Sequence, residues 1–129
     1  MSTPQPTSSP APALLIVEDD RLLRWSLREK FATQGWKVLE ADSGFAGLAA
    51  AGPLPIALAL VAVTLPDIDG AALASRLAAA HPECRIVLMG SAERPEAVAP
   101  RSTGWPVLEK PFDLDELVRW AARAAAGTG

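Results

Sequence analysis

The chain has few of the side chains from which most catalytic and metal-binding sites are built. Its 129 residues include one cysteine, one histidine and no tyrosine. The single Cys84 excludes an internal disulfide and fits a reducing compartment. His81 has no second histidine with which to form a metal or catalytic pair. We therefore expect Cys84 to pack inside the fold, His81 to lie at a solvated helix end, and neither to form a catalytic site.

An excess of positive charge is also missing. Twelve Lys and Arg residues stand against fifteen Asp and Glu residues, which gives a net charge of −3 and a pI near 5.1. Proteins that bind nucleic acids or anionic membranes directly carry clustered Lys and Arg side chains. We therefore expect no direct binding to nucleic acid and no binding to a membrane surface.

No hydrophobic run is long enough to cross a bilayer. The longest, residues 56–65, lies between two prolines and falls well short of the roughly 20 residues that a spanning helix needs. Residues 1–12 are rich in Ser, Thr and Pro and lack a basic start, which predicts a disordered tail rather than a secretory signal. We expect a cytoplasmic protein with one domain over residues 13–126, and a C-terminal end or linker start at 127–129.

Short apolar runs alternate with helical patterns along this domain. The runs predict strands, and the patterns between them have the four-residue spacing of helices, with Asp20 and Ser43 as capping residues. The predicted strands are 14–17, 36–41, 57–63, 85–89 and 106–109, and the predicted helices are 21–33, 43–52, 71–80 and 113–125. Five strands that alternate with helices indicate an α/β fold with a doubly wound parallel sheet.

Polar residues follow several of these strands, at the edge where such sheets bind ligands. Glu18 and Asp19 follow the first strand, Ser91 the fourth and Lys110 the fifth. Adjacent acids can hold Mg²⁺ through oxygen ligands, and a lysine can bind a phosphoryl oxygen. Each residue taken alone is equally consistent with a loop acid or a solvated charge. Their joint occurrence at strand ends favours a phosphate site.

Three motifs make a family resemblance specific. They are Leu14-Leu15-Ile16-Val17-Glu18-Asp19-Asp20, Leu65-Pro66-Asp67-Ile68-Asp69-Gly70 and Lys110-Pro111-Phe112. With them, residues 14–125 resemble the receiver domain of bacterial two-component response regulators, particularly nitrogen-regulation-type activators. The resemblance implies a flavodoxin-like fold with strand order 2-1-3-4-5, which accepts a phosphoryl group on aspartate with Mg²⁺ and changes a protein-binding face in response. It also implies Glu18, Asp19 and Thr64 as the metal-site residues.

The chain departs from the family pattern at three positions that take part in accepting the phosphoryl group or in the change that follows. The phosphoacceptor lies four residues before the loop proline in the family, and Ala62 occupies that position here. A methyl group cannot form an acyl phosphate, because the step requires a carboxylate oxygen as nucleophile. The family's phosphate-binding hydroxyl residue aligns with Gly90, for which the adjacent Ser91 could substitute if the strand slips by one residue. The switch aromatic is replaced by Val107.

The connection between the fourth and fifth strands is short and contains Pro95 and Pro100. Proline breaks the interior of a helix, so a fourth helix can hardly extend beyond residues 92–99. We expect Trp105 to cover apolar surface left open there, or to be an ordinary surface tryptophan. Trp120 should lie near Val107, and Trp105, Val107 and Trp120 form the predicted interaction face for a protein partner.

Because Ala62 replaces an aspartate, the strand ends keep two carboxylates, those of Glu18 and Asp19, where the family has three. This loss should change the electrostatics of the site. With one ligand fewer, Mg²⁺ should bind weakly at a vestigial site, and no cofactor should be required. Lys110 should then be the internal counterion, within salt-bridge reach of Asp19 or Glu18. Asp67 lies too far along the chain to act as acceptor. We expect Asp67 and Asp69 to stabilise the turn by hydrogen bonds to its backbone, with Gly70 at a positive φ.

The resulting hypothesis is a pseudo-receiver, a signalling domain that binds a protein partner without accepting phosphate and is not an enzyme. A homodimer is also possible. The main alternative is a working phosphoacceptor domain in which aspartate at position 62 has been replaced by design. A third possibility, a nucleotide or small-molecule sensor, is not supported by any glycine-rich phosphate loop.

Overall fold

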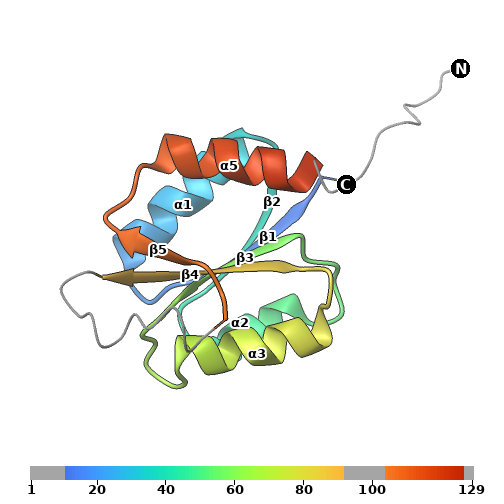
Figure 1. Ribbon diagram of the computed structural model, residues 1–129, viewed down its shortest axis with the longest axis vertical. Helices are drawn as coiled ribbons and strands as arrows, with labels where there is room; N and C mark the ends of the chain where they lie inside the picture. The colour runs from blue at the N-terminus through green and yellow to red at the C-terminus, as the bar shows by residue number, and fades with distance from the viewer. Residues whose placement is uncertain (1–10, 92–103, 127–129) are drawn as a thin grey trace, which may run out of the picture.

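Strands and helices alternate along the part of the chain that the computed structural model describes, residues 11–91 and 104–126 (Figure 1). The elements are β1 (Ala13–Val17), α1 (Arg21–Thr33), β2 (Lys37–Ala41), α2 (Gly44–Ala51), β3 (Leu58–Ala62), α3 (Gly70–Ala80), β4 (Arg85–Ser91), β5 (Val107–Lys110) and α5 (Leu114–Ala126). The strands are parallel in the order β2-β1-β3-β4-β5, which confirms the predicted fold class. The predicted short helix at 92–99 lies outside the described residues, as do residues 1–10 of the predicted tail and 127–129.

The two central strands, β1 and β3, are buried along their whole length. Each is a continuous run of apolar residues, as expected for strands that are covered on both faces. Helices α1 and α5 cover one face of the sheet, and α2 and α3 cover the other (Figure 1). The register pairs Val17 with Val61 and Ala62 with Met89, so these strands end at nearly the same level.

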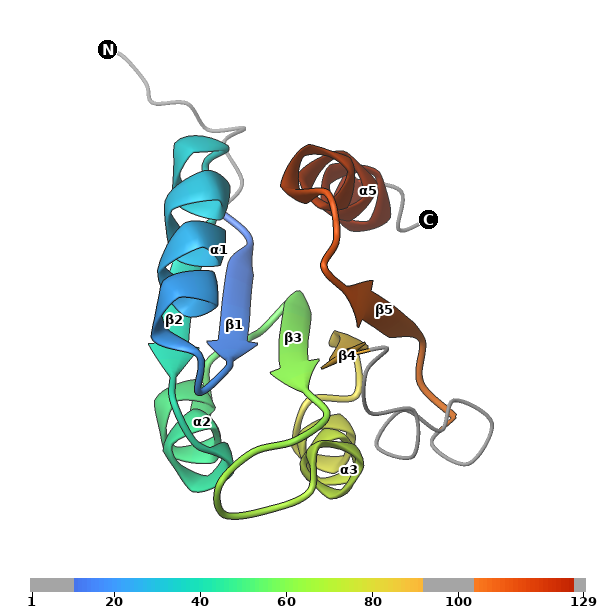
Figure 2. The ribbon, with the colours of Figure 1, turned by 90° about the vertical axis from the view of Figure 1, so that its left-hand side faces the viewer.

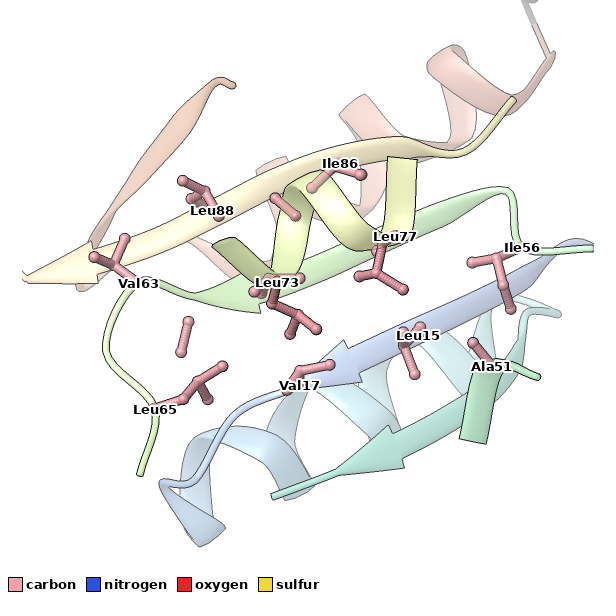
Figure 3. Close-up of a cluster of buried hydrophobic side chains, with 14 of the residues drawn as sticks. Leu15, Val17, Ala51, Ile56, Val63, Leu65, Leu73, Leu77, Ile86 and Leu88 are labelled. Atoms are coloured by element: carbon pink, nitrogen blue, oxygen red, sulfur yellow. The ribbon is translucent and has the colours of Figure 1, made fainter. Parts of the chain in front are cut away.

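Each face of the sheet has its own apolar cluster. On the side of α2 and α3, Leu15, Val17 and Leu88 of the strands gather with Leu73 and Leu77 of α3 (Figure 3). On the side of α1 and α5, the strands pack against side chains of these two helices, namely Leu27, Phe31, Leu117, Val118 and Ala121. Leu117, Val118 and Ala121 of α5 are all buried.

Short polar side chains begin the helices, largely as predicted. Asp20 accepts hydrogen bonds from the N–H groups of Leu22 (3.0 Å) and Leu23 (3.2 Å) at the start of α1. Ser43 and Asp69 cap α2 and α3 in the same way. Such caps satisfy backbone donors that have no partner within the helix, and each stabilises the fold by about 1 kcal/mol.

The loop after β3 differs from the expectation in two respects. The Asp67 carboxylate bonds to the backbone of its own turn, and it also accepts hydrogen bonds from the N–H groups of Gly44 (2.8 Å) and Phe45 (2.9 Å) of α2. Gly70 does not have a positive φ. A Cβ atom at Gly70 would instead lie 2.2 Å from the carbonyl oxygen of Ala62. Glycine is therefore required because the start of α3 packs directly on the backbone at the end of β3.

The strand ends differ by one or two residues from the sequence prediction, with the largest difference at β4, which continues to Ser91. In the part of the chain that the structure describes, no helix is both long and apolar enough to cross a membrane.

Candidate functional site

The carboxyl ends of four neighbouring strands bring the predicted site residues to one edge of the sheet. Glu18 directly follows β1, Ala62 ends β3, Ser91 ends β4 and Lys110 ends β5. Since Val17 pairs with Val61, the next residues, Glu18 and Ala62, leave their strands side by side. The edge therefore carries one acid, one methyl group and one cation across four neighbouring strands.

Within the part of the chain that the structure describes, Glu18 is the one polar residue that is buried, with 1 % of its surface exposed. One carboxylate oxygen, Oε1, accepts a hydrogen bond from the Lys110 Nζ atom at 2.8 Å. The other, Oε2, accepts one from the backbone N–H of Asp20 at 2.9 Å. A buried carboxylate is tolerated when it is paired and hydrogen-bonded in this way. The predicted ion pair of Lys110 is confirmed, and its partner is Glu18 rather than Asp19.

The backbone of Glu18 is fixed as firmly as its side chain. Its N–H donates to the carbonyl oxygen of Ala41 at 3.0 Å, which extends the pairing with β2. Its carbonyl oxygen accepts a hydrogen bond from the Arg24 guanidinium at 2.8 Å. Glu18 is thereby a rigid acceptor whose position is set by β1, β2 and the first turns of α1.

The Glu18–Lys110 ion pair spans a wide section of this edge. Two strands, β3 and β4, lie between β1 and β5 in the sheet. Three strand spacings amount to roughly 14 Å, so both long side chains must extend toward each other across the intervening strand ends. One of these ends carries Ala62, which is 1 % exposed. The lysine and the glutamate thus meet over the part of the sheet where the resemblance places the phosphoacceptor.

The residues expected to hold Mg²⁺ fit a tight site poorly. Mg²⁺ prefers octahedral oxygen coordination with carboxylate ligands, but both Glu18 oxygens already accept hydrogen bonds, one of them from a cation. Asp19 and Thr64 are exposed. Over residues 11–91 and 104–126, no three His, Cys, Asp or Glu side chains are grouped in a way that could hold a metal ion.

The end of β4 carries the residues predicted to replace the phosphate-binding hydroxyl. Gly90 is buried and pairs with Glu109, and Ser91 pairs with Lys110 in the strand register. Ser91 therefore leaves the sheet at the level of the lysine without any slip of the strand. A role for Gly90 or Ser91 in a degenerate phosphate pocket stays a prediction.

The predicted interaction face is divided between the two sides of the sheet. Val107 and Trp120 line a groove of about 300 Å³ between β5 and α5, two elements that lie together at the right of Figure 2. Trp105 is half-buried and packs against the apolar cluster on the side of α2 and α3. Val107 packs against the same cluster as Trp105, and Trp120 packs against the cluster on the other face of the sheet. The role of these three residues as an interaction face stays a prediction.

The groove between β5 and α5 is apolar with an acidic margin. Its walls include Leu108, Phe112 and Trp120. Asp113, directly before α5, and Glu116, in the first turn of α5, border it. The side chains of Leu108, Phe112 and Trp120 are half-buried, and partly exposed aromatic and apolar side chains commonly anchor protein partners.

Two polar contacts that tie the elements together could not be predicted from local sequence patterns. Lys30 of α1 forms an ion pair with Asp115 of α5, and this contact holds the pKa of the Asp115 carboxyl below its ordinary value. The hydrogen bond from the N–H of Phe45, with further ones from Gly44 and the loop backbone, likewise lowers the pKa of Asp67. Each contact joins residues far apart in the chain, so nothing in the neighbouring sequence signals it.

Cys84 packs partly inside the fold, as expected. Burial raises the pKa of the Cys84 thiol from 9.0 to about 11, so at neutral pH it is a protonated, weakly reactive group.

Comparison with known proteins gives consistent matches. The family model of the response regulator receiver domain matches residues 14–122. The chain is 34 % identical over 111 residues to the transcriptional activator protein PfeR of Pseudomonas aeruginosa, and it is 31 % identical over 109 residues to the response regulator receiver protein CpdR of Brucella abortus. These alignments cover 85 % and 81 % of this chain, but 36 % of PfeR against 89 % of CpdR.

Among solved structures, the receiver domain of NtrX from Brucella abortus is 26 % identical with a TM-score of 0.77, and the match covers 88 % of this chain and 98 % of that one. The chain also matches the DNA-binding transcriptional regulator NtrC of Salmonella typhimurium at 31 % identity, over 84 % of this chain and 24 % of that protein. The chain therefore spans about a quarter to a third of PfeR and NtrC.

Proposed function

The chain belongs to the response regulator receiver domain family, and from this premise we propose that it is a receiver that signals without being phosphorylated. In this proposal it acts in the cytoplasm as a protein-binding module of a two-component system, is not an enzyme and requires no cofactor. Its partner is a signalling or effector protein.

The observation that carries the proposal is the methyl group at the end of β3. Ala62 is buried at the edge where Glu18 and Lys110 meet, and it has no oxygen that could attack a phosphoryl donor. Lys110, which would contact a phosphoryl oxygen in a working site, instead bonds directly to Glu18 at 2.8 Å. The site can therefore hold its charges in balance without phosphate or a metal ion.

The neighbouring acids are poor substitutes for the missing aspartate. Glu18 is buried and paired with Lys110. Asp67 is bonded to the first N–H groups of α2, and Asp69 caps α3. Asp19 is exposed, so an assay of phosphorylation must also locate any phosphoryl group that this residue takes up.

Incubation with acetyl phosphate and Mg²⁺, followed by intact-mass spectrometry, tests the proposal. The chain with Ala62 should gain no mass, whereas a gain of one phosphoryl group, at Asp19 or elsewhere, would refute it. The matched variant Ala62→Asp restores the carboxylate. Continued inertness of this variant would indicate that the changes at Gly90 and Val107 also matter, while efficient phosphorylation would favour a working receiver whose aspartate was replaced by design.

The proposed partner contact is tested separately. We place it in the groove between β5 and α5, where Val107 and Trp120 lie together. Trp120→Ala should reduce recovery of a partner in a pull-down without loss of folding, checked by circular dichroism. Trp25→Ala removes an exposed tryptophan of α1, far from this groove, and should leave partner recovery unchanged. Equal recovery with all three proteins would contradict this placement.

A further inference from the structure

The outer face of α1 carries large apolar side chains that the fold leaves uncovered. Leu22 is 71 % exposed and Trp25 is 52 % exposed, and both are among the exposed large hydrophobic residues of the described chain. They lie one turn apart on α1, which Figure 2 shows in front of β1 and β2. An exposed indole next to an exposed leucine is the composition of an interaction surface rather than of an ordinary solvated helix face.

A shallow hollow lies directly beside Trp25. It has a volume of about 410 Å³ and is bordered by Arg24, Arg28 and Glu40 in addition to Trp25 itself. The two arginines are held in place by Glu40 of β2, at 3.3 Å from Arg24 and 3.1 Å from Arg28. The surface therefore offers a projecting aromatic ring and, next to it, a recess with guanidinium groups on which an aromatic ring can stack.

The charges on this helix face are arranged symmetrically about Trp25. Arg21 lies four residues before it and Glu29 four residues after it, which is about 6 Å along the helix axis in each direction. At 3.6 residues per turn, these two side chains point about 40° to either side of Trp25. Both are exposed. The face thus carries a positive charge at one end, an aromatic ring in the middle and a negative charge at the other end.

This pattern is complementary to itself under a two-fold rotation. If the α1 helices of two copies run in opposite directions and cross at about 50°, so that their i, i+4 rows of side chains lie along each other, Arg21 of each copy faces Glu29 of the other about an axis beside Trp25. A two-fold interface uses the same patch on both copies, so each favourable contact occurs twice. Neither a uniformly acidic nor a uniformly basic partner would match a face with opposite charges at its two ends.

The charged groups of the face are available for such contacts. Within residues 11–91 and 104–126, Arg21 forms no ion pair. Glu29 contacts Arg28 of its own helix at 3.2 Å, with side-chain exposures of 52 % and 38 %. Exposed pairs of this kind contribute little to stability, so Glu29 can exchange Arg28 for an arginine of a second copy.

We propose that the outer face of α1 binds a second copy of this chain, with Trp25 at the two-fold axis and Arg21 paired with Glu29 across it. The proposal concerns a surface distinct from the groove between β5 and α5 and does not depend on the absence of phosphorylation. One helix face per copy places the contact among weak interfaces, below about 1,200 Å² in total. Dimers should therefore form reversibly at high micromolar concentration rather than persist on dilution.

Charge reversal gives a sharp test by sedimentation velocity of the 129-residue chain over a range of concentrations. Arg21→Glu produces a face with two acids, and Glu29→Arg produces one with two bases. Each single variant should self-associate about 10-fold or more weakly than the natural chain, because two attractive contacts become repulsive. An equimolar mixture of the two variants should recover association, since Arg–Glu pairs then form on both sides of the axis.

Arg123→Glu on α5 and Glu83→Arg before β4 change exposed charges elsewhere and serve as matched controls that should not alter association. Trp25→Ala should abolish association, and Trp120→Ala should leave it intact. A chain that stays monomeric up to 1 mM would overturn the proposal. Dimers that are insensitive to both charge reversals, or a mixture that fails to associate, would also overturn it.

Discussion

Loss of the Lys110 ammonium should destabilise the domain because it leaves the Glu18 carboxylate buried without a counterion. The substitution Lys110→Met keeps much of the length and apolar character of the side chain while removing its charge. Glu18 is 1 % exposed, and it cannot turn into water without breaking its bond to the Asp20 N–H. The variant therefore isolates the electrostatic role of the ion pair.

The size of the effect follows from the burial of the two partners. Removal of one member of a fully buried ion pair costs about 3–5 kcal/mol. Here the Lys110 side chain is 26 % exposed, and Glu18 keeps one hydrogen bond, so we expect a loss of about 2–3 kcal/mol in the free energy of unfolding. Glu18→Gln should cost about 1 kcal/mol, because the amide oxygen can still accept from Asp20 and the lysine can turn toward solvent.

Urea denaturation of both single variants and the double variant measures the coupling between the two residues. We expect a coupling free energy of about 1–2 kcal/mol. Glu29→Gln, which removes an exposed ion pair with Arg28, is the matched control and should change stability by about 0.5 kcal/mol or less. A loss below about 0.5 kcal/mol for Lys110→Met, or a coupling indistinguishable from zero, would show that the pair does not hold this edge of the sheet.

Three further predictions concern other parts of the fold. Gly70→Ala should lower stability by about 2–3 kcal/mol in thermal denaturation, because its Cβ would lie 2.2 Å from the Ala62 carbonyl oxygen; an unchanged melting temperature would exclude this packing. Because the pKa of Asp67 is lowered in the folded state, its stabilisation is present above the ordinary value of 3.8 and is lost as the pH falls through the folded-state pKa. Melting curves of Asp67→Asn should thus lie below those of the natural chain at pH 7 and converge with them in acid, and a gap that is constant with pH would contradict this. Burial raises the pKa of the Cys84 thiol from 9.0 to about 11. Its thiolate fraction near pH 8 should therefore be about 100-fold lower than in the unfolded chain. Equal rates of reaction with a disulfide reagent in the folded and unfolded states would contradict this.

Patterns within single segments predicted the fold well. The apolar runs of β1 and β3 identified buried parallel strands, and Asp20 and Ser43 correctly marked helix starts. The Glu18–Lys110 contact was also predictable, because parallel strands bring their carboxyl ends to one edge and opposite charges there must balance. In each case the signal lies in the residues of the element itself or in the topology that the elements imply.

Contacts between distant segments were not predictable in the same way. Asp67 has the sequence context of a turn residue, and its bonds to α2 depend on how the loop after β3 lies against that helix. Gly70 is explained by an approach of backbone to backbone that composition does not reveal. Trp105, which precedes β5, and Trp120 of α5 pack on clusters at opposite faces of the sheet.

In the proposed function, the strand-end site balances its own charges and has no nucleophile for phosphate. Backbone amide spectra recorded before and after addition of beryllofluoride with Mg²⁺ test this most directly, because the pair mimics an aspartyl phosphate where a carboxylate can receive it. We predict that the amide signals of residues around Glu18, Ala62 and Lys110 will show no saturable shift as beryllofluoride and Mg²⁺ are added. Saturable shifts at these strand ends, spreading to β5 and α5, would contradict the account.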